Sequence, residues 1–313
     1  AEAVILAYGH FRSKRKKVLL SRAVNPEYRA TIRTYMQSDS SLLILGDDIE
    51  TGIEPDLKKL IAQIDNDTAL VLVQYPDFFG RILDYKELIE TAHAHGALVA
   101  MAVNPTALGL LTPPGELGAD IALGEGQPLG IPLSYGGPYL GFFAVKSALL
   151  RKIAGRLVGE TVDAEGKLAY VLTLTAREQH IRREKASSNI CSNQGLLTLA
   201  ATIYLSILGK HGFKQVANLC YQKAHYAAHQ LAGIEGFSLL NEDLPFFHEF
   251  VLKSEQPVEQ VLDHLLQHDI FGGYDLSKEY PELENCLMLA VTEKMTRENI
   301  DYLCDVLEEV DHA

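Results

Sequence analysis

The feature that most constrains the fold is an alternation of short apolar runs with amphipathic segments through the first two-thirds of the chain. Runs that are apolar along their whole length are typical of strands buried on both faces of a parallel sheet. Asn25 and Pro26 suit the cap and first position of one intervening helix, and Gly96 suits the end of another. The alternation predicts a mostly parallel sheet with helices on both faces. The expected strands are 18–21, 42–45, 69–75, 97–103, 121–124 and 140–145, with further helices near 56–64 and 84–95.

The pattern changes after Lys185, where longer helical stretches replace the alternation. Helices are expected at 194–208 and 213–231, and a closing helix at 297–310 has Thr296 as a suitable N-cap. The change predicts a large α/β domain over 1–210 and a smaller α+β domain over 211–313. The other elements expected in the second domain are strands at 246–252 and 286–291 and a helix at 258–267.

The charge balance limits the partners of the chain. Its 313 residues include 28 Lys and Arg against 41 Asp and Glu, a formal net charge of −13. An acidic chain repels nucleic acid and anionic membranes unless its basic residues cluster. One basic cluster exists at 12–17, and we interpret it as the solvated start of a strand because an apolar run follows directly. The sequence therefore predicts no nucleic-acid partner.

Membrane and redox signals point to a cytoplasmic protein. No apolar run reaches the ~18 residues of a membrane helix, and no stretch has the pattern of a signal peptide. The four cysteines are widely spaced, without the pattern of a zinc site, and are expected to be reduced core thiols. The chain opens without an initiator Met, as if inside a helix, so residues upstream are expected to be missing.

A loop rich in Gly and Pro follows the strand expected at 121–124. Gly136 and Gly137 allow backbone N–H groups to approach an anion closely, as phosphate-binding nests do. A tight turn explains the same residues, and spacing alone favours the turn. There is no Lys or Arg between Glu87 and Val145. This region therefore cannot supply a lysine for a Schiff base at the end of a strand.

A second polar constellation occupies 175–192. Arg side chains bind carboxylate or phosphate in a bidentate way, and Ser and Asn add directional hydrogen bonds. The alternative is a solvated helix end with pairs such as Glu178 and Arg182, and composition alone favours it. The candidate anion-binding residues are Arg182, Arg183, Lys185, Ser188 and Asn189.

Two histidine pairs, His225/His229 and His264/His268, have the i,i+4 spacing that chelates a metal on a helix. Neither pair belongs to an H-E-x-x-H pattern, and no third ligand is evident in the sequence. Solvated helix faces explain both pairs, so the sequence predicts no metal site.

Two segments of the chain, 123–138 and 177–191, resemble the glycine cleavage system P-protein family. These proteins are pyridoxal-phosphate-dependent glycine dehydrogenases (decarboxylating). The segments are similar to the N-terminal half of the long single-chain form, or to the alpha subunit of the split form, and shorter motifs at 21–29 and 113–121 agree. The resemblance implies the aspartate-aminotransferase type of fold, pyridoxal-phosphate fold type I, with a smaller C-terminal domain. It also implies that the N-terminal part of the alpha form, with its Gly/Ser-rich turn, is lacking here.

The resemblance further implies that this chain has no complete active site. In the family only the beta half carries the Schiff-base lysine. Gln127 occupies the lysine position here, and Met101 falls where the beta half has the Asp that pairs with the pyridine nitrogen. A lysine-bearing beta subunit is thus expected to hold pyridoxal phosphate, to decarboxylate glycine, and to pass the aminomethyl group to lipoyl H-protein.

The contribution expected of this chain is to its partner's site. The resemblance implies that Tyr135, Gly136 and Gly137 reach across the interface to the cofactor phosphate, and that the Arg-rich segment lines the shared cleft. Two alternatives stay open: an inert scaffold with a vestigial site, and a self-sufficient enzyme that uses another lysine such as Lys185. Retention of the two glycines favours a contributing subunit over the scaffold. The residues at 127 and 101 argue against the self-sufficient enzyme.

Overall fold

The computed structural model describes residues 1–46, 57–175, 178–186, 188, 190, 194–240 and 242–310. Its contacts divide the chain into two compact units. The first consists of Ala1–Val73, Tyr85–Ala102 and Pro113–Tyr204, and the second of Gln74–Asp84, Val103–Thr112 and Leu205–Ala313. The division falls inside the long helix α7 (Gly195–Leu231). Segments 74–84 and 103–112 group with the second unit, whereas the expected boundary at residue 210 assigned both to the first domain.

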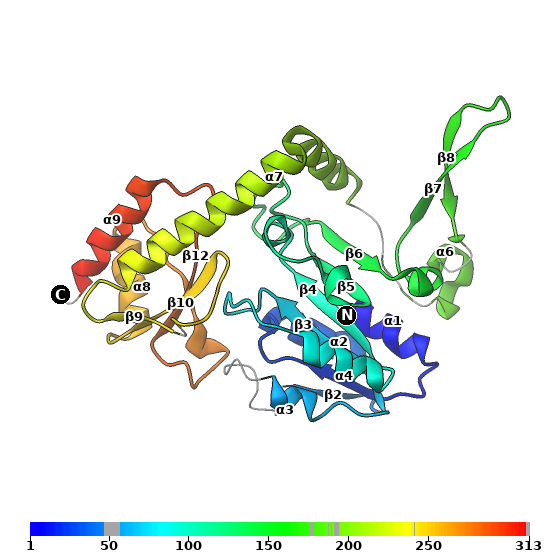
Figure 1. The fold of residues 1–313 in the computed structure, drawn as a ribbon, viewed down its shortest axis with the longest axis horizontal. Helices are drawn as coiled ribbons and strands as arrows, with labels where there is room; N and C mark the ends of the chain where they lie inside the picture. The colour runs from blue at the N-terminus through cyan, green and yellow to red at the C-terminus, as the bar shows by residue number, and fades with distance from the viewer. Residues whose placement is uncertain are drawn as a thin grey trace. The chain divides into compact units, whose positions relative to one another are not determined.

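A six-stranded sheet in the order β2-β1-β3-β4-β5-β6 forms the centre of the first unit (Figure 1). Strand β1 pairs in parallel with β2 and β3, and β4 pairs in parallel with β5. Strand β6 pairs with β5 in the antiparallel direction. This mostly parallel sheet confirms the α/β class expected from the apolar runs. The strands are β1 (Lys17–Leu20), β2 (Leu43–Leu45), β3 (Thr68–Tyr75), β4 (Leu98–Val103), β5 (Ile121–Glu125) and β6 (Gly141–Val145).

Two helix ends of this unit lie where the sequence signals them. The Asn25 side chain caps its helix by accepting the N–H of Glu27 at 2.9 Å, with Pro26 in the first turn. Gly96, with a φ of +68°, follows the end of another helix, as a C-cap glycine does. The first five helices of the chain lie in this unit: α1 (Glu2–His10), α2 (Pro26–Met36), α3 (Lys58–Ile61), α4 (Lys86–Ala94) and α5 (Pro114–Leu117).

One apolar core lies between helices α1 and α2 and the sheet. Val4 of α1 and Ile32 of α2 pack in the same cluster as Leu70 and Leu72 of β3, and all four are almost wholly buried. Burial of such side chains contributes roughly 1.5–3 kcal/mol each. The near-continuous apolar runs are therefore explained by a sheet whose central strands have no solvated face.

The second unit contains a four-stranded antiparallel sheet in the order β11-β12-β10-β9. Ala224 and Leu231 of α7 pack into one core with the sheet and two further helices. The last helix starts with a capping box, in which Thr296 and Asn299 each bond the other's backbone N–H, as the N-cap prediction implies. The elements are β9 (Phe237–Leu239), β10 (Glu249–Ser254), α8 (Val258–Gln267), β11 (Tyr274–Asp275), β12 (Cys286–Ala290) and α9 (Arg297–Glu308).

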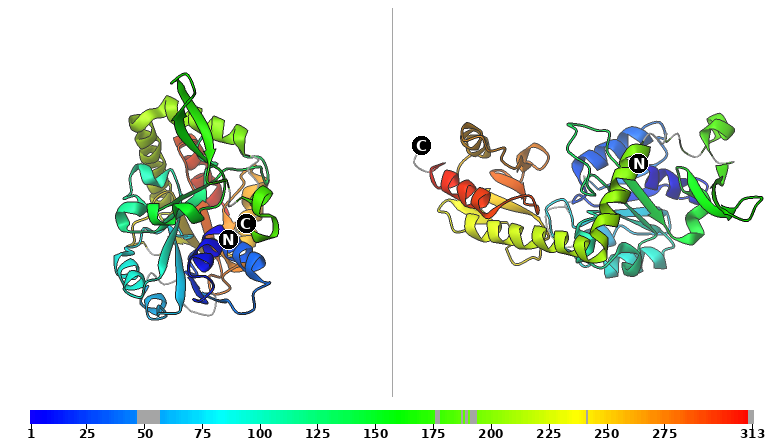
Figure 2. Two further views of the ribbon diagram at one scale, coloured as in Figure 1. Left: turned by 90° about the vertical axis from the view of Figure 1, so that its right-hand side faces the viewer. Right: turned by 90° about the horizontal axis from the view of Figure 1, so that it is seen from above.

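Helix α7 runs through the position where two helices were expected. Gly209 has a φ of +58° and a ψ of −172°, so the α-helical geometry is interrupted there (Figure 2). The interruption lies between the predicted helices 194–208 and 213–231. Glycine suits this position because its missing Cβ removes the steric cost of a positive φ.

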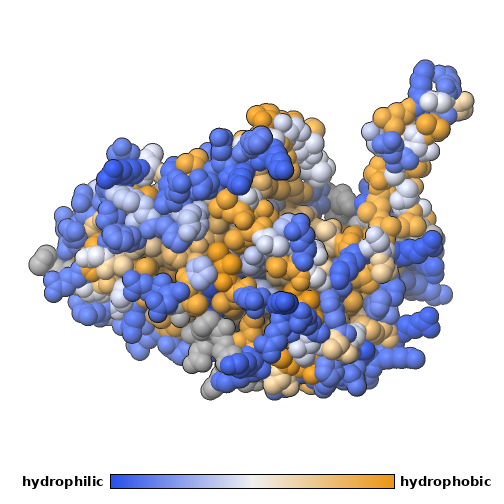
Figure 3. Space-filling view, in the orientation of Figure 1, coloured by the Kyte–Doolittle hydropathy of each residue, from blue (hydrophilic) through white to orange (hydrophobic). Residues whose placement is uncertain are grey.

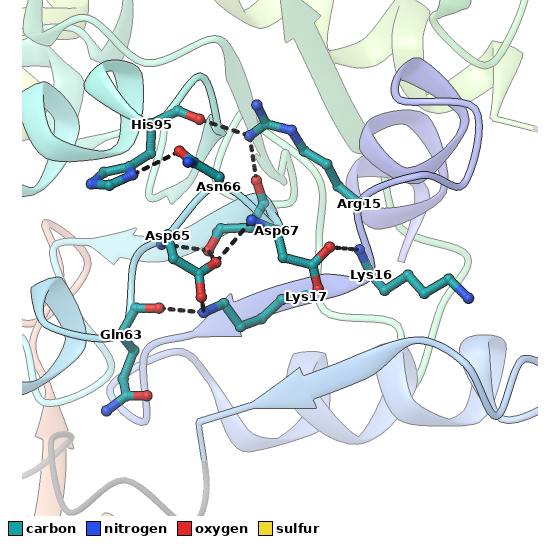
Figure 4. Close-up of polar contacts among 9 residues, drawn as sticks. Arg15, Lys16, Lys17, Gln63, Asp65, Asn66, Asp67 and His95 are labelled. Carbon is teal, nitrogen blue, oxygen red and sulfur yellow. Dashed lines mark hydrogen bonds and ion pairs between the residues drawn. The ribbon is translucent and has the colours of Figure 1, made fainter.

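The basic run at 12–17 is only in part the solvated strand start that we expected: Arg12, Lys14 and Lys16 are exposed, but Arg15 and Lys17 have partners within the chain (Figure 4). Lys17 is buried, and its Nζ donates to the Gln63 carbonyl at 2.6 Å and to Asp65 Oδ2 at 2.5 Å. Arg15 Nη1 donates to the backbone carbonyls of Thr68 and His95, at 2.8 and 2.9 Å. Two cations of the run thus satisfy backbone carbonyls at the start of β3, at the end of helix α4 and after helix α3. These contacts leave fewer of its cations for a polyanion.

Candidate functional site

Glu125, the last residue of β5, closes the Gly- and Pro-rich loop. Its Oε1 accepts the backbone N–H of Gln127 at 3.0 Å and that of Leu140 at 2.8 Å, so one carboxylate oxygen ties the two ends of the loop together. Gly126 N–H also donates to the Leu140 carbonyl at 2.6 Å. The carboxylate therefore fixes where the loop leaves and rejoins the sheet. Glu125 was not predicted as a site residue, although an acidic residue close to the end of an apolar run is a visible signal in the sequence.

Gln127 is at the position assigned to the lysine of the family, and its side chain hydrogen-bonds within the loop to which it belongs. Its Nε2 donates to the Ile131 carbonyl at 2.6 Å. An amide nitrogen is not a nucleophile, and a donor occupied in this way orders the loop. In this chain Gln127 therefore orders the loop 126–140 by this hydrogen bond.

Met101, at the position assigned to the aspartate, is fully buried in β4, opposite Ala122 of β5. A thioether carries no charge and is only a weak hydrogen-bond acceptor. It cannot stabilise a protonated pyridine nitrogen. Met101 has the environment of a core side chain in a central strand.

A pocket of about 380 Å³ lies on the face of the sheet that α1 and α2 cover. Ala102 lines it together with Leu72 and Glu125. Successive side chains of a strand point to opposite faces, so Met101 faces away from this pocket. The pocket and the Met101 position therefore do not form one site.

The loop Tyr135–Gly137 is exposed and has an unusual backbone. The φ angles of Tyr135, Gly136 and Gly137 are +47°, +112° and +120°. The Tyr135 side chain is fully exposed, and a Cβ added to Gly136 would meet no atom within 4 Å. This loop is open to a second molecule, and its glycines are required by its backbone and not by packing within the chain.

The Arg-rich segment is also at the surface. Arg182, Arg183 and Lys185 are exposed at the junction of helix α6 (Gln179–Arg182) and the short 3₁₀ helix Arg183–Lys185. Arg183 has a φ of +53°, a conformation that costs a non-glycine residue roughly 1–3 kcal/mol. Asn189 lies outside the described residues.

Ser188 is placed against the start of α1. Its hydroxyl hydrogen-bonds the carboxylate of Glu2, but burial outweighs this bond and holds the pKa of Glu2 above its ordinary value. The Ser188 hydroxyl also accepts the N–H of Ile190 at 3.1 Å. Ser188 therefore has structural partners within this chain, whereas Gly136 is exposed and an added Cβ there would meet no atom within 4 Å.

A hairpin of β7 (Leu157–Val162) and β8 (Leu168–Thr173), which the sequence analysis missed, projects from the first unit as an arm (Figures 1 and 3). Opposite residues in the register share a face, and one face pairs Val158 with Leu172 and Val162 with Leu168. These side chains are 50–64 % exposed, and Tyr170 on the same face is 67 % exposed. An isolated hairpin is marginally stable in water. The signal was present as two apolar-rich runs on either side of Asp163–Lys167.

The start of α7 carries a second exposed apolar stripe. Leu196, Leu199 and Ile203 follow helical spacing and are 77, 55 and 50 % exposed. By length and composition α7 is the one described helix that qualifies as a membrane span. The interruption at Gly209 leaves the preceding helix shorter than the ~20 residues of a span. A protein interface explains the stripe better.

Comparison with known proteins identifies the family of the chain. The model of the "Glycine cleavage system P-protein" family matches residues 1–307. A probable glycine dehydrogenase (decarboxylating) subunit 1 from Anoxybacillus flavithermus is 52 % identical over 303 residues, which cover 97 % of this chain and 66 % of that protein. The corresponding protein of Desulforamulus reducens is also 52 % identical, with 97 % and 67 % covered. The chain thus spans about two thirds of the length of these curated relatives.

Solved structures match the chain as well, one from the same family and one that shares only the fold. The crystal structure of an inhibitor-bound glycine decarboxylase (P-protein) is 39 % identical and superposes with a TM-score of 0.88, covering 99 % of this chain and 68 % of the other. A sphingosine-1-phosphate lyase of Burkholderia pseudomallei, at 16 % identity and a TM-score of 0.69, covers 99 % of this chain and 67 % of the other and shares the fold alone. The fold is the aspartate-aminotransferase-like type I fold of pyridoxal-phosphate enzymes. By the extent of both matches, the chain belongs to the glycine cleavage system P-protein family.

Proposed function

We propose that this chain is the subunit of a glycine decarboxylase that lacks the Schiff-base lysine and completes the active site of a lysine-bearing partner. The observation that carries the proposal is the apolar face of the β7–β8 arm, because a second chain that covers it would bury side chains that are at least half exposed in this chain. The names of the curated relatives, subunit 1 of a glycine dehydrogenase, support a further subunit as the occupant and glycine as the substrate.

The two residues at the positions assigned to the lysine and the aspartate do not fit a covalently held pyridoxal phosphate. Gln127 donates its amide N–H to Ile131 and offers no amine, and Met101 is a buried thioether. We therefore assign the cofactor to the partner subunit. The cofactor supplies an electron sink for breaking the bond between Cα and the carboxylate. Lipoyl H-protein is the proposed acceptor of the aminomethyl group.

The role proposed for this chain is to bind and orient an anion. The backbone N–H groups at Gly136 and Gly137 are presented by an exposed loop, and such groups stabilise phosphate oxygens. Arg183 is held in a strained backbone conformation at the surface, where its guanidinium can pair with a phosphate or a substrate carboxylate. Glu125 positions the loop by accepting the N–H groups of Gln127 and Leu140.

The loop role is tested by Gly136→Ala in the assembled complex. A Cβ at a φ of +112° strains the loop by about 1–2 kcal/mol without a clash, so cofactor affinity should fall roughly fivefold or more. Gly155→Ala is the matched control, because Gly155 also has a positive φ, +81°, and no atom within 4 Å of an added Cβ. Equal cofactor affinity in both variants would favour the inert scaffold.

The Arg-rich segment is tested separately by Arg183→Ala. The matched control is Arg12→Ala, since Arg12 is likewise exposed and has a φ of +53°. We expect Arg183→Ala to lower glycine decarboxylation by the complex about tenfold, as loss of a bidentate anion contact would. Activity and cofactor affinity that match those of the control would remove Arg183 from the site.

A further inference from the structure

The second unit brings a third metal-binding side chain to one of the two histidine pairs. His264 lies in the last turn of α8, and His268 directly follows this helix. Glu309 follows the end of α9. One ring nitrogen from each histidine and a carboxylate oxygen of Glu309 lie within 4.8 Å of one another. The sequence could not supply this third donor, because Glu309 is far from the histidines along the chain.

A hydrogen bond of His264 leaves one of its ring nitrogens suited to bind a metal. Its Nε2 lies 3.1 Å from the backbone carbonyl of Val306 in α9. A carbonyl oxygen only accepts, so Nε2 carries the proton and Nδ1 keeps a free lone pair. Metal-binding histidines commonly donate their other N–H to a carbonyl in this way, which fixes the tautomer and the ring orientation.

The last turn of α9 is acidic, since Asp305 and Glu308 shortly precede Glu309 in the chain. Glu309 is exposed, so its side chain is free to move toward the histidines. Two ligands of a tetrahedral zinc ion lie about 3.4 Å apart, given metal–ligand bonds of roughly 2.1 Å. A shift of the exposed carboxylate therefore closes the cluster.

We propose that His264, His268 and Glu309 form a binding site for a divalent transition-metal ion such as Zn²⁺, which links the end of α8 to the end of α9. The donor set of two imidazoles and one carboxylate is one that zinc accepts, with a fourth position left to water. This site lies wholly within the second unit and is independent of the proposed enzymatic function.

The test is a titration of the full chain with Zn²⁺ alone, in competition with a chromophoric chelator. We expect one site of micromolar affinity, weakened roughly tenfold or more by His268→Gln and severalfold by Glu309→Gln. Glu309 is exposed, so this second variant gives an answer even if His268→Gln perturbs folding.

His229→Gln is the matched control. The pair His225/His229 also lies on a helix at i,i+4, and His225 Nε2 also lies 3.1 Å from a carbonyl, that of Phe246. Among the residues that the structure describes, no carboxylate completes this pair. Zinc affinity should change by less than about twofold in the control. The absence of a micromolar site, or an equal loss in His229→Gln and His268→Gln, would overturn the proposal.

Discussion

Strand β3 and the β7–β8 arm consist of similar residues in opposite environments. In β3 every side chain from Thr68 to Val73 is buried between neighbouring strands and helices. In the arm, Val, Leu and Tyr side chains of one face are at least half exposed. The same apolar chemistry thus stabilises the chain itself in one region, and in the other is available to stabilise an assembly.

The comparison separates two free energies. Burial in β3 contributes to the free energy of unfolding of this chain alone, whereas burial of the arm would contribute only to the free energy of association. Substitutions of the same kind in the two regions should therefore act on different measurements.

The largest effect on stability is expected for Val71→Asp. Val71 is fully buried in β3, and a carboxylate there has no partner to offset the loss of its hydration. The loss should be about 4 kcal/mol or more, a large part of the stability of a typical domain. Circular dichroism and urea unfolding measure it. A variant that unfolds like the wild type would contradict the buried position of β3.

A smaller loss, about 1–3 kcal/mol, is expected for Asp120→Asn. Burial raises the pKa of Asp120, but Lys146 at 2.8 Å, the Val99 N–H and His93 outweigh it and hold this pKa below its ordinary value. The carboxylate thus stabilises the fold at any pH above the pKa of the unfolded chain, about 3.9.

The pH dependence provides the check on Asp120. The stability advantage of the wild type over Asp120→Asn should shrink as the pH falls through the lowered pKa of the folded protein. Urea unfolding of both proteins at neutral pH and near pH 3 measures the difference. An advantage that grows on acidification would show that the pKa is raised instead.

A loss of about 1 kcal/mol is expected for Thr296→Ala, which removes the capping box at the start of α9. Thr296→Ser keeps the hydroxyl that accepts the Asn299 N–H and is the control. Comparing the melting temperatures of the two variants separates the contribution of the capping hydroxyl to stability from that of the methyl group. Equal melting temperatures would mean that the cap contributes little.

The smallest effect on stability is expected for Val158→Asp in the arm. Val158 is 63 % exposed, so the charge stays hydrated and the free energy of unfolding should change by less than about 0.5 kcal/mol. Affinity for the partner subunit should fall roughly tenfold or more, since the charge would be buried on assembly. Analytical ultracentrifugation of the mixture measures it. Unchanged affinity would mean that the arm is not the docking surface.

The sequence was most informative where local chemistry decides the structure. The apolar runs predicted the strands of the main sheet, and Asn25, Gly96 and Thr296 marked helix ends correctly. The basic run was predicted only in part, because the carbonyls that Lys17 and Arg15 bind come from residues 63–95, far from the run in the sequence.

The candidate site was less accessible to sequence reasoning. The roles assigned to positions 127 and 101 came from a family resemblance, while the closure of the loop after β5 by Glu125 includes a contact across fifteen residues that only a fold provides. The third donor of the histidine cluster, Glu309, was missed for the same reason. Long-range pairing depends on how elements pack, and residue types alone do not specify it.

The most direct test of the central claim is to trap the cofactor with borohydride. The chain alone, and then the chain mixed with its lysine-bearing partner, is incubated with pyridoxal phosphate and reduced, and mass spectrometry locates the label. We predict no specific label on the chain alone, a label on the partner in the mixture, and glycine decarboxylation only by the mixture. A stoichiometric label on a lysine of this chain, such as Lys185, would contradict the assignment of Gln127 and make the chain a pyridoxal enzyme in its own right.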